Sequence, residues 1–284
     1  MLLIFSTVAS ASAIDLQKVN PAANRIIGGD PTTIDRYPAI VQLEFFGLST
    51  GTWGQSCGAN ILTTRWLVSA AHCFEGASYT GPSSRRVRAG ATYRNTGGVV
   101  INLDVVINHP NYTHAAVYDA DISLMRTQTA FVYSPFIQAG SIYSQGVILP
   151  DNSPVVHAGW GYTSENLTEE GPSSSQLLDV TIYTLNLTLC ADRYTDFPGY
   201  VVTENMICAG ILDVGGKDAC PGDSGGPLYH GNNNVIAVSF KIPTKPKNPS
   251  KLSAAKELYA GGRPASVTIQ SHFRETIESA RVIV

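Results

Sequence analysis

A serine flanked by glycines lies in the stretch Gly222-Asp223-Ser224-Gly225-Gly226-Pro227. Neither a helix nor a central strand favours glycine beside a serine, whereas glycine lets backbone N–H groups approach a ligand closely. Asp223 adds a charge that must be paired if it is buried. The stretch alone is as consistent with a surface turn as with a catalytic nucleophile, so the choice depends on finding a base and an orienting acid.

The sequence contains both groups. His72 ends the apolar run that begins at Val68, and Asp121 begins the alternating apolar run Asp121–Met125. A serine hydroxyl is a poor nucleophile until a base takes its proton, and a carboxylate can hold that base in the required tautomer. A lone histidine here would be more typical of a protein core, and Asp119 is a second candidate for the acid. Together, the three residue types predict nucleophilic catalysis by Ser224, His72 and Asp121.

The order His, Asp, Ser resembles that of the trypsin/chymotrypsin-like serine proteases and differs from the subtilisin and α/β-hydrolase orders. Of the two acids, Asp121 directly precedes the apolar pair of the family motif. The resemblance implies that Ser224 is the nucleophile, His72 the general base and Asp121 the residue that orients it. The backbone N–H groups of Gly222 and Ser224 would form the oxyanion hole. Segments 95–98 and 212–216 are most similar to those of insect digestive trypsins.

The implied activity is hydrolysis of peptide bonds after Arg or Lys through an acyl-enzyme, with no cofactor and no metal. Asp218, six residues before Ser224, would lie at the floor of the primary specificity pocket, where a carboxylate selects basic side chains. Otherwise it is a solvated loop residue beside Lys217. Ser239 matches the strand that pairs with the substrate backbone.

Several residues around the expected pocket depart from the family pattern. Lys241 replaces a glycine at the pocket mouth, Ala265 or Ser266 replaces a second wall glycine, and Pro221 replaces a glutamine at the rim. Residues 241–263 form an atypical loop, rich in lysine and proline, as expected for a mobile segment or for an error in the gene model. The competing interpretation is a catalytically impaired secreted homologue that acts as a binding protein.

The N-terminal region resembles that of a secreted zymogen. Residues 1–13 are apolar and end in small residues, which predicts a signal peptide. Residues 14–25 would be an activation propeptide, followed by the protease domain at 26–284. By resemblance, cleavage between Arg25 and Ile26 would free an α-amine that pairs with Asp223, because a buried carboxylate needs such a partner. We therefore expect a secreted, extracellular protein with a digestive role, for which the gut lumen is the candidate compartment.

The chain has five cysteines, an odd number for a secreted protein. The resemblance pairs Cys57 with Cys73, beside His72, and Cys190 with Cys208. It would pair Cys220 with a later cysteine, but none follows it. Cys220 is therefore expected to have no disulfide partner within the chain.

The fold is expected to be all-β, because short runs rich in Val, Ile, Leu and aromatic residues alternate with turn residues. Such runs occupy 39–45, 59–62, 66–69, 99–107, 122–126, 155–161 and 178–185. The resemblance implies two antiparallel six-stranded β-barrels, at about 26–143 and 144–284, with a C-terminal helix around 272–277. A net charge of −3 gives no argument for nucleic acid, and no apolar stretch reaches about 18 residues. We expect a monomer whose partners are protein or peptide substrates and proteinaceous inhibitors, with no nucleic-acid or membrane partner.

Overall fold

The computed structural model describes residues 28–143, 148–162, 173–195, 201–211, 217, 219–231, 234–239 and 265–268. Side chains are described in these ranges except at 234, 236–239 and 265–268. Several predicted features lie outside the described residues. These are the signal peptide, the propeptide with Arg25 and Ile26, Asp218, Lys241, the atypical loop and the C-terminal helix.

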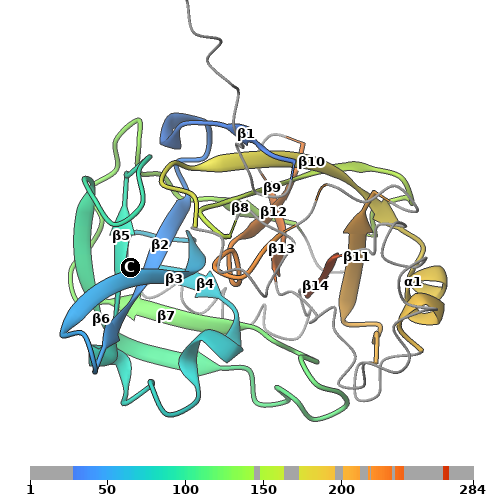
Figure 1. Ribbon diagram of the computed structural model, residues 1–284, viewed down its shortest axis with the longest axis horizontal. Coiled ribbons are helices and arrows are strands. Elements are labelled where there is room, and N and C mark those ends of the chain that lie inside the picture. The colour runs from blue at the N-terminus through green and yellow to red at the C-terminus, as the bar shows by residue number, and fades with distance from the viewer. Residues whose placement is uncertain are drawn as a thin grey trace, which may run out of the picture.

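The first half of the chain closes into a barrel of six strands with the order β2-β3-β4-β7-β6-β5 (Figure 1). The strands are β2 (Ile40–Gly47), β3 (Thr52–Ile61), β4 (Trp66–Ser69), β5 (Arg85–Ala89), β6 (Val99–Asn108) and β7 (Ser123–Thr127). All of these pairings are antiparallel. Alternate residues point inward because successive side chains of a strand face opposite sides, and they form a core that includes Val41, Leu43, Val87, Leu103 and Met125. This unit is called barrel one below.

The second half contains an antiparallel sheet, called barrel two below. Its strands are β9 (Pro154–Gly159), β10 (Leu178–Leu185), β11 (Met206–Gly210), β12 (Pro227–His230), β13 (Asn234–Ser239) and β14 (Ala265–Thr268). The order is β10-β11-β14-β13-β12-β9, and β9 also pairs with β10, so the pairings return to their starting strand. The short strands β1 (Asp30–Pro31) and β8 (Ser141–Ile142) join it at β10 and β13.

The predicted all-β class is confirmed. β4 and β10 have the bounds expected from the sequence, and the runs expected at β2, β6, β7 and β9 differ from those strands by no more than two residues at either end. The run 59–62 covers only the end of β3, which begins at Thr52. Ala265 and Ser266, expected in the pocket wall, lie in β14, which pairs with both β11 and β13. Single turns of 3-10 helix occur at η1 (Ile34–Arg36), η2 (Ala71–Phe74) and η3 (Pro82–Ser84).

The sequence analysis did not predict α1 (Leu187–Tyr194), which lies at the outer end of barrel two (Figure 1). The side chain of Asn186 caps this helix by accepting hydrogen bonds from the backbone N–H groups of Thr188 and Leu189. Asparagine favours this position because its oxygen satisfies N–H groups that have no partner within the helix. No helix in the part of the chain that the structure describes is long and apolar enough to cross a bilayer.

Candidate active site

His72 and Asp121 are brought together by η2 and by the segment that leads into β7. Asp121 is fully buried, and its Oδ2 lies 2.7 Å from Nδ1 of His72. Its Oδ1 accepts a second hydrogen bond, 2.9 Å long, from the backbone N–H of His72. One carboxylate therefore holds both the ring and the backbone of the histidine. With Nδ1 as the donor, Nε2 is left free to accept a proton.

Asp119, the rival acid, points to a different part of the molecule. Its Oδ1 accepts hydrogen bonds from the hydroxyl of Thr203 at 2.6 Å and from the side-chain amide of Asn205 at 3.0 Å. Asp119 and Asp121 are separated by Ala120, whose backbone φ of +50° turns the chain sharply between them. Thr203 and Asn205 immediately precede β11, so Asp119 links the segment before β7 to barrel two.

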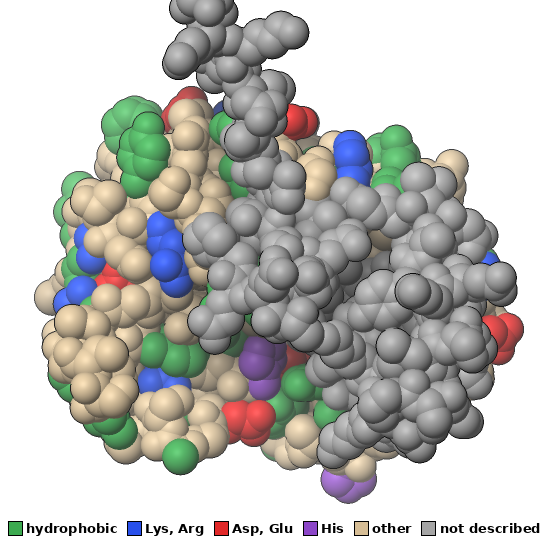
Figure 2. Space-filling model, in the orientation of Figure 1, with side chains coloured by type: hydrophobic (Ala, Val, Ile, Leu, Met, Phe, Trp, Pro, Cys, Tyr) green, Lys and Arg blue, Asp and Glu red, His purple; other side chains and the backbone are tan. Residues whose placement is uncertain are grey.

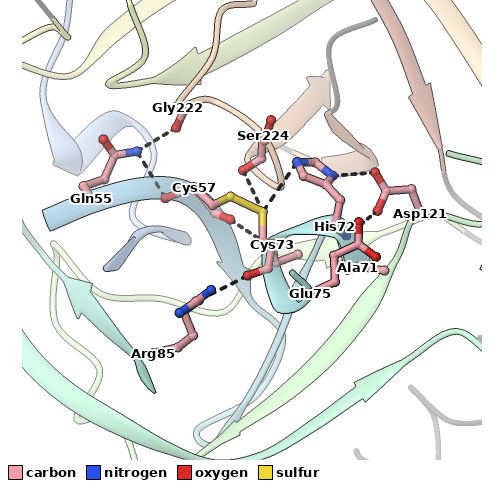
Figure 3. Close-up of a disulfide and its surroundings, with 12 residues drawn as sticks. Gln55, Cys57, Ala71, His72, Cys73, Glu75, Arg85, Asp121, Gly222 and Ser224 are labelled. Atoms are coloured by element: carbon pink, nitrogen blue, oxygen red, sulfur yellow. Dashed lines mark hydrogen bonds and ion pairs between the residues drawn. A yellow bond between two sulfur atoms is a disulfide. The ribbon is translucent and has the colours of Figure 1, made fainter. Parts of the chain in front are cut away.

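Ser224 lies next to His72, and both residues lie against the disulfide between Cys57 and Cys73 (Figure 3). The Sγ of Cys73 is 3.8 Å from both the Nε2 of His72 and the carbonyl oxygen of Ser224. The backbone N–H of Gly58 donates a 2.7 Å hydrogen bond to the same carbonyl. Residues 57–73 of barrel one thus anchor the serine segment of barrel two beside the histidine.

The glycines around Ser224 are required by close approaches of the backbone. Gly225 has a φ of +77°, and a Cβ placed there would overlap the hydroxyl of Ser69. A Cβ at Gly58 would come within 2.8 Å of the Cα of Gly226. The two barrels therefore meet at this serine through backbone atoms, which only glycine permits at such distances.

Residues 220–223 form a tight turn immediately before Ser224. The N–H of Asp223 donates a 2.9 Å hydrogen bond to the carbonyl of Cys220, and Gly222 has a φ of +97°. This is the signature of a type II turn, in which proline at the second position and glycine at the third are preferred. Pro221, which the sequence analysis treated as a departure at the pocket rim, therefore pre-sets the backbone for the turn that presents the N–H of Gly222.

Asp223 is buried, and its carboxylate accepts hydrogen bonds from the backbone N–H groups of Gly161 at 2.7 Å and Cys220 at 2.9 Å. A Cβ on either Gly159 or Gly161 would overlap this carboxylate. The absence of side chains at the two glycines that flank Trp160 thus leaves room for Asp223. Nothing in the spacing of the sequence indicated that contact.

Arg85 supports the histidine from inside barrel one and was not singled out from the sequence. Its fully buried side chain donates to the carbonyl of Cys73 at 3.2 Å (Figure 3). Its guanidinium lies 3.6 Å from the centre of the Phe45 ring. Burial lowers the pKa of this guanidinium to about 10. The alternation of β5 could have revealed it, because Arg85, Val87 and Ala89 share the inward face.

The two predicted disulfides, Cys57–Cys73 and Cys190–Cys208, are confirmed. Cys220 is buried and belongs to neither. The side chains of Cys57, His72 and Cys73 lie close enough to share a metal ion, but the two sulfurs are bonded to each other and do not offer thiolate ligands.

Comparison with known proteins agrees with this geometry. The sequence model of the family described as Trypsin matches residues 26–258, most of the chain. The chain belongs to the trypsin family. It is accordingly a serine endopeptidase of a family whose members act on protein substrates and are blocked by protein inhibitors.

Similar proteins come from insects, as the sequence analysis predicted. "Trypsin, alkaline C" of Manduca sexta is 43% identical over 234 residues, which cover 82% of this chain and 84% of the relative. "Trypsin CFT-1" of Choristoneura fumiferana is 41% identical over 214 residues, 75% of this chain and 79% of the relative. "Vitellin-degrading protease" of Bombyx mori is 30% identical over 237 residues, 82% and 83% of the two chains.

The surface of barrel one has no single dominant character on the face shown. Basic, acidic and apolar side chains are intermixed over its strands (Figure 2). Among the ion pairs of the described residues, those of Arg86 and Arg88 with the buried Glu44 join β5 to β2.

Proposed function

We propose that this protein is a secreted trypsin, made as a zymogen, that cleaves peptide bonds after Arg or Lys and acts in digestion. Ser224 attacks the scissile carbonyl, and His72 takes the serine proton and later protonates the leaving amine. Asp121 holds the imidazole in the correct tautomer and stabilises its charged form. The N–H groups of Gly222 and Ser224 bind the developing oxyanion.

The observation that carries this proposal is that the buried carboxylate of Asp121 contacts both the ring and the backbone of His72. The placement of Ser224 beside that ring, with both residues against the Sγ of Cys73, supports the choice of Ser224 as the nucleophile. The relatives named as trypsins support the choice of substrate side chain. Asp218 would supply the carboxylate that selects it, and Ser239 and Lys241 would line the same pocket.

Activation would follow cleavage of the Arg25–Ile26 bond, after which the α-amine of Ile26 pairs with Asp223. The protease domain would then span residues 26–284, after loss of a signal peptide at 1–13 and a propeptide at 14–25. A basic residue at the cleavage site fits an enzyme that can activate its own precursor.

The test is a burst titration with a guanidinobenzoate ester after cleavage at Arg25, with Ser224→Ala as the control. A stoichiometric burst that the control lacks is expected, because it requires the nucleophile, the oxyanion hole and a pocket for a basic group together. Labelling of Ser224 by a fluorophosphonate without a burst would contradict the specificity for Arg and Lys. No reaction with either reagent would favour the binding homologue.

A further inference from the structure

Gln55, in β3 of barrel one, contacts the turn that precedes Ser224 in barrel two. Its side chain is buried, with 2% of its surface exposed. The Nε2 of Gln55 donates a 2.6 Å hydrogen bond to the carbonyl of Gly222 and a 3.1 Å bond to the carbonyl of Cys57 (Figure 3). Both protons of this amide are therefore used, one of them on the residue proposed to supply an oxyanion donor.

Arg94 sets the orientation of that amide. Its Nε donates to the Oε1 of Gln55 at 2.7 Å, and its Nη2 donates to the backbone carbonyl of Gln55 at 2.5 Å. Arginine has only donors, so the oxygen of the amide must face Arg94 and the NH₂ group must face Gly222. Arg94 is partly buried, and this desolvation lowers the pKa of its guanidinium.

The segment that carries Arg94 is held from both barrels. The N–H of Arg94 donates to the carbonyl of Ser175, and the N–H of Gln55 donates to the side-chain oxygen of Asn95. The N–H of Asn95 in turn donates to the side chain of Gln42, which is fully buried. These bonds fix Arg94 relative to both β3 and the segment leading into β10.

The two peptide groups on either side of Gly222 are each held by a hydrogen bond. The carbonyl of Pro221, which shares a peptide group with the N–H of Gly222, accepts a 2.9 Å bond from the N–H of Tyr162 in barrel two. The carbonyl of Gly222 accepts the bond from Gln55 in barrel one. Glycine has the freest backbone of any residue, so the direction of its N–H depends on restraint from both sides.

We propose that Gln55, oriented by Arg94, is a positioning residue for the Gly222 N–H of the oxyanion hole. This inference rests on the proposed function, because it assigns Gly222 a donor role in catalysis. Loss of the Gln55 bond removes one of two hydrogen bonds that hold the peptide group between Gly222 and Asp223, the other being the bond from the Asp223 N–H to the Cys220 carbonyl. A displacement of about 1 Å at a catalytic group can cost about 100-fold in rate.

The test compares the substitution Gln55→Glu with Gln42→Glu in the activated full-length enzyme. Gln55→Glu keeps the shape and the acceptor for Arg94 but removes the donor to Gly222. We expect kcat to fall about 10- to 100-fold with KM nearly unchanged. Affinity for a peptide aldehyde that ends in arginine, whose adduct places an oxyanion in the hole, should fall by a similar factor. Gln42→Glu alters a buried glutamine of the same network without touching Gly222. It should change kcat and the affinity for the aldehyde less than about threefold.

Thermal unfolding of both variants separates positioning from general damage. If Gln55→Glu does not fold, Gln55→Met, which also lacks the donor, takes its place. Arg94→Lys should give an intermediate loss of kcat, because an ammonium cannot hold both oxygens of Gln55 as the planar guanidinium does. Equal kinetics of the Gln55 and Gln42 variants, in an enzyme whose parent reacts with a fluorophosphonate, would overturn this inference alone. A parent that does not react would overturn the proposed function and this inference with it.

Discussion

Each barrel buries a basic side chain among its strands, Arg85 in barrel one and His157 in barrel two, and the two environments differ. Arg85 donates to the carbonyls of Cys73, Ser78 and Ser84 and keeps its charge. In the part of the chain that the structure describes, neither ring nitrogen of His157 has a hydrogen-bond partner, and burial lowers its pKa to about 4. A buried charge that is solvated by carbonyls can position its neighbours, whereas an unpartnered ring can only remain neutral.

The two sides of the candidate active site are also held in place by different means. Barrel one supplies His72 and Asp121 from a segment braced by the Cys57–Cys73 disulfide and by Arg85. Barrel two supplies Ser224 from a turn whose Cys220 takes part in no disulfide. That turn is instead held by backbone hydrogen bonds to Asp223 and by the contact with Gln55. The serine side of the site is therefore held by hydrogen bonds within barrel two and by one from Gln55 in barrel one, whereas the histidine side carries a disulfide.

The largest expected effect distinguishes the two acids that flank Ala120. Asp121→Asn should lower kcat at neutral pH by about 10⁴-fold, because an amide favours the wrong tautomer of His72. Asp119→Asn retains an oxygen that can accept from Thr203 and Asn205, so kcat should change less than about threefold. Steady-state kinetics with an arginine ester measure both. A large loss in the Asp119 variant would mean that the link to barrel two matters as much as the contact with His72.

The next effect concerns stability and tests the role assigned to Arg85. Arg85→Met should lower the free energy of unfolding by about 3 to 5 kcal/mol, because it leaves buried carbonyls without donors. Arg126→Met, at a partly exposed ion pair with Asp104 in the same barrel, should cost less than about 1 kcal/mol. Urea unfolding near pH 8 provides the comparison. Similar losses in the two variants would show that Arg85 does not stabilise barrel one through these bonds.

The smallest effect depends on pH and belongs to barrel two. The pKa of His157 is about 4 in the folded protein, against an ordinary value of 6.5, so the unfolded chain binds the proton more readily. Protonation of His157 therefore has no effect on the free energy of unfolding above about pH 6.5. As the pH drops toward 4, the unfolded chain binds the proton first, and the free energy of unfolding falls by about 3 kcal/mol in total.

His157→Val should remove this dependence, since valine suits a buried strand and does not titrate. The measurement is the free energy of unfolding of parent and variant from pH 8 to pH 4, because other groups contribute equally to both curves. Curves that stay parallel over this range would contradict the assignment to His157.

The strands of barrel one were largely predictable because their apolar residues alternate and glycine, asparagine or threonine interrupts them. The helix α1 was missed because its one strong signal is the single capping residue Asn186. The candidate residues His72, Asp121 and Ser224 could be named from residue type, order and neighbours. Gln55 and Arg94 could not, since a polar residue in a strand does not reveal which distant carbonyl it will meet.

The sequence by itself determined the family and the all-β class, and it named Ser224, His72 and Asp121 as candidates for the chemistry. These follow from local patterns, in which each residue is interpreted with its immediate neighbours. Only the tertiary structure decided which aspartate faces His72, why Gly159 and Gly161 flank Trp160, and how Gln55 reaches Gly222. Each of these depends on the distance between segments far apart in the chain. That distance is set within barrel one for Asp121, within barrel two for Gly159 and Gly161, and by the packing of the two barrels for Gln55.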